Sequence, residues 1–155
     1  DYLPGLGGAI ENVKGTVTLN NVTIADNQAT DGGAIRTTNG KSFTSGNSII
    51  ADNSSDDCEG TLDSKGYNLI LDTSGCTIKG STSTDVIGED PILQPLALNA
   101  PGTTETQALT AGSPALKAAN PAKPNGIDGH CLPTDQRGVT RPKGACDIGA
   151  FQLSN

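Results

Sequence analysis

Three basic residues in the N-terminal half are the first candidates for chemistry. Lys14 lies about one repeat before Arg36 and Lys41, so the three side chains could share one face of a repetitive fold. Lyases that act on acidic polysaccharides use such a base opposite carboxylates or a metal ion. Long cations on neighbouring repeats are more typical of a solvated surface, and we expect no catalysis there. His130 lies in a Pro- and Gly-rich loop without an evident Ser or Cys partner, so nucleophilic catalysis is not predicted.

Acidic residues near the turns are the second candidate group, because Ca²⁺ takes roughly six to eight oxygen ligands. The candidates are Asp31, Asp56, Asp57, Glu59 and Asp63. The sequence has no Asp-x-Asp-x-Asp-Gly loop, and acids in turns are usually solvated. We therefore expect no cofactor and no metal site, with Ca²⁺ as the one cofactor left open.

Four cysteines, Cys58, Cys76, Cys131 and Cys146, allow three disulfide connectivities. No Cys-x-x-Cys spacing is present and the chain has one His, which argues against zinc. We expect Cys58–Cys76 and Cys131–Cys146, since each pair closes a local loop and stabilises the fold by about 3 kcal/mol. Four buried free thiols are the alternative. Disulfides predict an oxidising, extracytoplasmic location.

Two further sets of polar residues are predicted to be structural. Asn21, Asn47 and Asn68 are expected to stack at one corner and to satisfy backbone groups there. Asn21 and Asn53 begin glycosylation sequons, but an inward Asn21 cannot carry a sugar, and chance matches are common at this composition.

In the C-terminal part, ion pairs are expected to fix the chain. We expect Arg137 or Arg141 to pair with Asp135 or Asp147 through bidentate hydrogen bonds. Removing such an Arg should loosen this part of the chain.

The elements that position these residues are indicated by a repeat. Gly-Gly-Ala-Ile at residues 7–10 returns at 32–35, and the segment at 21–27 returns in similar form at 47–53. Short β-branched runs separated by Gly or Asn at this period are typical of stacked parallel strands. The sequence therefore predicts an all-β fold, a right-handed single-stranded parallel β-helix (solenoid) of about three to four coils over residues 1–88.

Residues 89–155 differ in character, because they hold every proline except Pro4. Their apolar runs are too frequent for a linker. We expect a Pro/Gly-rich extension that packs on the same domain, forms at most one helical turn near 113–118 and ends in a strand over 147–153.

The turn and strand motifs resemble those of bacterial right-handed parallel β-helix surface proteins, including polymorphic outer-membrane passengers. The second half resembles the C-terminal "choice-of-anchor" region of such proteins. The motifs that carry this likeness are, in order, Asp-Cys at 57–58, Gly-Tyr-Asn-Leu-Ile at 66–70, Asp-Pro at 90–91, Pro-Leu at 95–96, Gly-Ser-Pro-Ala at 112–115, Asp-Gln-Arg-Gly at 135–138, Arg-Pro at 141–142 and Cys-Asp-Ile-Gly-Ala-Phe at 146–151. The resemblance implies the fold, secretion and a surface role, and brings no catalytic motif.

The start of the chain leads directly into a repeat without an amphipathic capping helix. Uncovered first strands present unpaired backbone groups that bind another strand. We expect an assembly edge formed by Tyr2, Leu3, Leu6 and Ile10. A chain without Met is also expected to be a processed product or a piece of a longer protein.

The favoured hypothesis is a non-catalytic extracellular structural or adhesive protein, which is either a head-to-tail filament subunit or the C-terminal piece of a surface passenger. The alternative is a polysaccharide lyase or hydrolase that acts on acidic glycans. Glycan binding without turnover is weakened because Tyr2 and Tyr67 are the only tyrosines and there is no Trp. A net charge of -7 disfavours nucleic acid and anionic membranes as partners, and no apolar run is long enough to span a membrane. We expect a secreted or cell-surface location.

Overall fold

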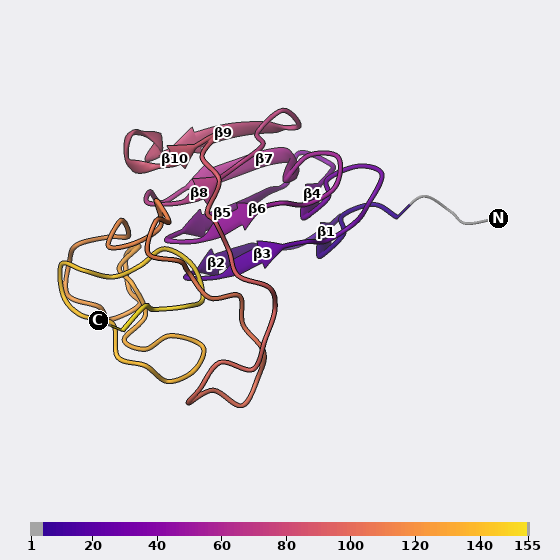
Figure 1. Cartoon of the computed structure of the whole chain (residues 1–155). Coiled ribbons are helices and arrows are strands. Elements are labelled where there is room, and N and C mark those ends of the chain that lie inside the picture. The colour runs from indigo at the N-terminus through magenta and orange to yellow at the C-terminus, as the bar shows by residue number, and fades with distance from the viewer. Residues whose placement is uncertain (1–4, 155) are drawn as a thin grey trace.

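Short strands separated by Gly, Asn and Asp turns dominate the first half of the computed structural model, which describes residues 5–154 (Figure 1). The strands are β1 (Ile10–Asn12), β2 (Val17–Asn20), β3 (Thr23–Ala25), β4 (Ile35–Thr37), β5 (Ser42–Gly46), β6 (Ile49–Ala51), β7 (Cys58–Ser64), β8 (Leu69–Ile70), β9 (Cys76–Gly80) and β10 (Val86–Ile87). A 3₁₀ turn, Thr82–Thr84, is the one helical segment within residues 5–154.

The strands form two sheets, and every strand pair is parallel. The six-stranded sheet has the order β1-β4-β7-β5-β2, with β9 also paired to β7, and the four-stranded sheet has the order β10-β8-β6-β3. The repeated segments lie side by side in register, with Ile10 opposite Ile35 and Thr23 opposite Ile49. Each copy of the repeat therefore pairs with the next through its backbone.

The expected single-stranded β-helix of three to four coils is wrong, although the all-β class with parallel strands is confirmed. β4 pairs with Cys58 and Glu59 at the start of β7, and β5 pairs with residues 61–64 of the same strand. Strands that were expected on separate faces are therefore joined in one curled sheet. The strands are also short, from 2 to 7 residues, and the result is a small domain of two parallel sheets. The repeat period identifies neighbouring strands, but it does not show where the chain bends between them.

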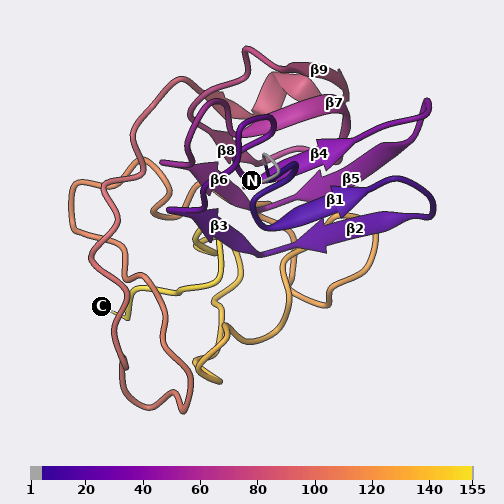
Figure 2. The ribbon, with the colours of Figure 1, turned by 90° about the vertical axis from the view of Figure 1, so that its right-hand side faces the viewer.

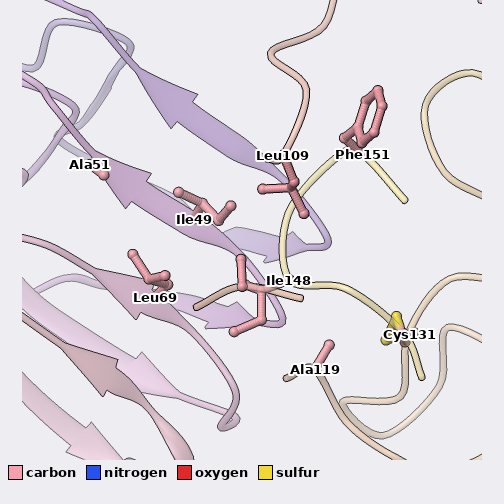
Figure 3. Close-up of a cluster of buried hydrophobic side chains, with 10 residues drawn as sticks. Ile49, Ala51, Leu69, Leu109, Ala119, Cys131, Ile148 and Phe151 are labelled. Atoms are coloured by element: carbon pink, nitrogen blue, oxygen red, sulfur yellow. A yellow bond between two sulfur atoms is a disulfide. The ribbon is translucent and has the colours of Figure 1, made fainter. Parts of the chain in front are cut away.

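Two apolar cores lie on opposite faces of the four-stranded sheet. One fills the space between the sheets and contains Ile35, Phe43, Ile50, Leu62 and Ile70, among others. The other lies between the outer face of this sheet and the C-terminal part of the chain (Figure 3). Because the sheet is covered on both faces, the run Ile49–Ala51 is apolar throughout rather than alternating.

Residues 88–154, here called the extension, contain isolated antiparallel bridges but no named strand. They lie beside and below the sheets in the view of Figure 2. The expected strand over 147–153 is not formed, because Ile148 and Phe151 turn into the core. Between them Gly149 has φ +93°, and a Cβ there would lie 2.8 Å from Ile49 Cδ1. The chain can approach the sheet this closely only without a side chain. Near 113–118, the Leu116 N–H donates to Ser113 O, as in a single turn.

Candidate functional site

Asn21 and Asn47 lie at the corners after β2 and β5 and connect the sheets to the extension. The Oδ1 of Asn21 accepts from the Leu132 N–H at 2.8 Å, and the Oδ1 of Asn47 accepts from the Asn120 N–H at 2.8 Å. The Asn47 carbonyl accepts from the Gly149 N–H at 2.8 Å. Both Asn residues are buried and have φ 53°, a left-handed conformation that Asn tolerates. Their amides bond mainly to the extension backbone.

The register between β6 and β8 places Asn68 opposite Ser48 rather than opposite Asn47. Its Oδ1 accepts from Ser45 Oγ at 2.8 Å and from the Ser48 N–H at 3.3 Å. Its own N–H donates to Asp85 Oδ1 at 2.9 Å. Asn68 therefore joins the corner of β5 and β6 to the start of β10.

A second row of polar side chains was missed in the sequence. Asn53 Oδ1 accepts from the backbone N–H and the Nδ2 of Asn27, at 3.0 and 2.9 Å. Asp57 Oδ1 accepts in turn from the N–H and Nδ2 of Asn53, at 3.2 and 2.9 Å. Burial raises the pKa of Asp57, partly opposed by these hydrogen bonds. The available signal was the Asp-Asn dipeptide that both repeats contain.

Asp135 and Arg137 form the buried ion pair of the extension. Arg137 donates to Asp135 Oδ2 through Nη2 at 2.7 Å and through Nε at 2.9 Å, and its guanidinium stacks 3.5 Å from the ring centroid of Phe151. Burial alone would raise the pKa of Asp135. Hydrogen bonds from the Gln152 N–H, Arg137 and the Val139 N–H outweigh burial, so the pKa is lowered.

Arg141 and Asp147, the other two predicted charges, meet through the backbone. Arg141 is 3% exposed and donates to the carbonyls of Asp147 at 3.0 Å and Gly149 at 2.6 Å. The Asp147 carboxylate accepts from the N–H groups of Lys117 at 2.7 Å and Leu153 at 2.6 Å. Within the described chain, Arg141 has no carboxylate partner within ion-pair distance. Burial lowers the pKa of Arg141 to about 10, so it stays charged at neutral pH.

Both predicted disulfides are confirmed. Cys58–Cys76 links β7 to the start of β9, and Cys131–Cys146 links two segments of the extension. The sequence separations are 18 and 15 residues, so each bond closes a local loop. Two disulfides fit an extracytoplasmic location.

The candidate catalytic cation Arg36 is held by two carboxylates. Its Nε lies 2.8 Å from Glu59 Oε2 and its Nη1 lies 3.3 Å from Glu11 Oε1. The three side chains follow the register of β1, β4 and β7. Lys14 and Lys41 are exposed. Arg36 therefore serves as the centre of an ion-pair row.

The candidate metal ligands are also used in local structure. Asp56 Oδ1 accepts from the Gly32 N–H at 2.9 Å, and Asp63 pairs with Lys65 at 3.3 Å. Asp31 is exposed. Within residues 5–154 no group of three or more His, Cys, Asp or Glu side chains is arranged to hold a metal ion.

His130 contributes its backbone to the seam between the two halves. Its carbonyl accepts from Asn20 Nδ2 at 2.9 Å, while its Nδ1 is buried without a partner. Nearby, a groove of about 460 Å³ lies between β2, β5 and residues 126–129. Thr18, Thr44 and Lys65 are among its lining residues, and none of the lining residues is aromatic.

The two open edges of the sheets are the candidate functional site. β1, β2 and β3 form one edge, the β1 edge, and β9 and β10 form the opposite one, the β9 edge (Figure 1). Within the described residues, each of these strands pairs with a single neighbour. Leu6 and Ile10 are half-buried at the β1 edge, whereas Tyr2 and Leu3 lie outside the described residues. Unpaired strand edges bind other strands through their backbone groups.

Three of the four inward side chains at these edges are incompletely covered, and the fourth, Ile24, is buried. The two inward rows are Val17, Phe43, Leu62 and Ile78 in the six-stranded sheet and Ile24, Ile50, Ile70 and Ile87 in the four-stranded sheet. The middle members are fully buried, but Ile87 is 45% exposed and Ile78 and Val17 are half-buried. Sequence reasoning identified the β1 edge alone, because nothing in residues 76–87 marks the last strand of a sheet.

The chain matches no protein-family model, no curated protein and no solved structure. The resemblance to bacterial β-helix surface proteins stays a prediction that depends on the sequence motifs. No helix in residues 5–154 has the length and apolar character needed to cross a bilayer.

Proposed function

We propose that this protein is a non-catalytic structural protein, secreted or on the cell surface, that assembles head-to-tail through its two sheet edges. The observation that carries the proposal is the pair of open edges on opposite sides of the same parallel sheets. Within residues 5–154 each edge strand pairs on one side only, and each edge has half-covered aliphatic side chains. A head-to-tail assembly of this kind at the cell surface would serve as an adhesin.

Two physical terms favour association. An added strand forms backbone hydrogen bonds and buries the apolar surface of Ile78 and Ile87, and each 100 Å² of such surface is worth roughly 2.5 kcal/mol. The two edges differ from each other, so the contact is heterologous and leaves a free edge at both ends of every oligomer. Contacts of this kind give open filaments rather than closed rings.

The absence of a catalytic role is supported by the environment of the most favourable base. Arg36 is paired on both sides with carboxylates, which leaves it poorly placed to abstract a proton from a glycan. The two disulfides and the buried polar rows are features that a durable extracytoplasmic scaffold requires.

The test is the size of the purified protein as its concentration rises, measured by sedimentation velocity and by negative-stain electron microscopy. We expect oligomers that grow with concentration and end as fibres. Ile87→Lys should abolish this growth, because a Lys at the β9 edge resists burial.

Ile127→Lys is the matched control, since Ile127 is also exposed, at 61%, but lies in the extension. It should assemble like the unchanged protein, and circular dichroism should show both variants folded. A monomer at every concentration, or equal loss of assembly in both variants, contradicts the proposal.

A further inference from the structure

One register runs through the six-stranded sheet from the β1 edge to the β9 edge. Along β2, β5, β7 and β9, the inward row is Val17, Phe43, Leu62 and Ile78, and the adjacent outward row is Thr18, Thr44, Asp63 and Lys79. The inward row is wholly apolar and the outward row wholly polar. A slip of one residue would exchange the two faces, so this alternation fixes the register of any strand added at either end.

The four-stranded sheet has a continuous register but no such alternation of polarity, because both of its faces are covered. Its rows are Thr23, Ile49, Leu69 and Val86, and Ile24, Ile50, Ile70 and Ile87. In both sheets, the repeated strands are paired at the same sequence spacing, since Val17 is opposite Phe43 and Thr23 is opposite Ile49. The two strands of one repeat therefore keep their relative places in the next repeat.

We infer, on the basis of the proposed self-assembly, that the β9 edge binds the β1 edge of a second copy in this same register. β9 then pairs in parallel with β2 of the second copy, which places Ile78 opposite Val17 and Lys79 opposite Thr18. In the other sheet, β10 pairs with β3 of the second copy and Ile87 lies opposite Ile24. The partner is identified by the parallel direction, the inward aliphatic row and the common spacing of the two sheets.

The two edges contribute unequally to the contact. Ile24 is already 7% exposed in the single chain, whereas Ile87 is 45% exposed. Most of the newly buried apolar surface therefore comes from the β9 edge and from Val17. Changes at Ile87 should accordingly weaken assembly more than changes at Ile24.

Disulfide trapping tests the register in the double variant Thr18→Cys/Lys79→Cys. Both positions are exposed. Within one chain they are separated by three strand spacings, or about 14 Å, which exceeds the roughly 7 Å that a disulfide spans. A disulfide between them must therefore join two copies. After mild oxidation we expect a ladder of multimers on non-reducing gels, with the 18–79 linkage identified by mass spectrometry beside intact native disulfides.

The control is Thr16→Cys/Lys79→Cys, which moves one thiol two residues along the same exposed face. In the inferred register these two Cα atoms lie about 8 Å apart, so we expect roughly tenfold less cross-linking. The single variant Lys79→Cys is a second control, because its one added thiol forms a disulfide only where the β9 edges of two copies meet each other.

The outcomes separate the two proposals. Association without a preference for the 18–79 linkage, or efficient dimers of Lys79→Cys alone, overturns the register and leaves self-assembly standing. Absence of any association at high concentration overturns both.

Discussion

The sheets and the extension both bury apolar side chains, but different kinds of hydrogen bond hold the two regions in place. Residues 10–87 are joined mainly by backbone pairs between repeated strands. Residues 88–154 have no named strand, and their scattered backbone hydrogen bonds are supplemented by bonds from carbonyls and N–H groups to buried side chains. Arg141, Asp147 and Asp135 lie at the centre of this arrangement. Backbone pairing tolerates many sequences, whereas side-chain bonding needs a specific residue at each point. The extension should therefore be the more sensitive half to single substitutions.

The largest effect is expected for Arg141→Met. The change leaves the carbonyls of Asp147 and Gly149 without their donor inside the core. Each buried acceptor left unsatisfied typically costs about 1 to 3 kcal/mol, so the loss of both bonds should cost roughly 2 to 6 kcal/mol. Urea unfolding measures the loss, and hydrogen exchange should show the extension opened while β5 and β7 stay protected.

Lys143→Met provides the comparison, because Lys143 is exposed and close in sequence. It should change the free energy of unfolding by less than about 0.5 kcal/mol. Equal protection of both halves in Arg141→Met would show that the extension does not depend on this side chain.

Next in size are the two disulfides, which differ in the region they hold. Their sequence separations of 18 and 15 residues are similar, so chain entropy predicts a loss of about 3 kcal/mol for either pair when both cysteines become Ala. The regional effect should differ. Without Cys58–Cys76 the exchange rate should rise in β9, and without Cys131–Cys146 it should rise in the extension. Identical exchange patterns for the two variants would contradict the separation into two regions.

The sequence anticipated the features that depend on local spacing. Both disulfides were identified because each closes a short loop, and the parallel strands were identified because the repeats align. The curl of the larger sheet was missed, since residues 58–64 contain Gly60 but continue as one strand. The contacts of Arg141 were also missed. They go to backbone carbonyls, and a carbonyl acceptor has no signature in a sequence.

A smaller effect is expected where the two halves meet. Asn47→Ala removes the acceptor for the Asn120 N–H and the donor to Gly129 O, both at 2.8 Å, and places Ala at φ 53°. We expect a loss of about 2 kcal/mol. Asn125→Ala, at an exposed position in the extension, is the control. Thermal unfolding of both variants measures the difference, and a loss in Asn47→Ala no larger than in Asn125→Ala would rule out this anchor.

The smallest effect is the response to acid, which should differ in sign between Asp135 and Asp57. The pKa of Asp135 in the extension is lowered, because hydrogen bonds outweigh burial. The ionised Asp135 therefore stabilises the fold above the ordinary pKa near 3.8. This stabilisation is lost as the pH falls through the folded pKa of Asp135. The pKa of Asp57 beside the sheets is raised by burial. Its folded form binds a proton first, so stability rises as the pH falls through its folded pKa towards 3.8. In Asp135→Asn, the free energy of unfolding should therefore fall less steeply as the pH drops below 3.8. In Asp57→Asn, the free energy of unfolding should no longer rise as the pH drops towards 3.8. If both variants changed the same limb of the profile, the two carboxylates would not differ in the way that their surroundings require.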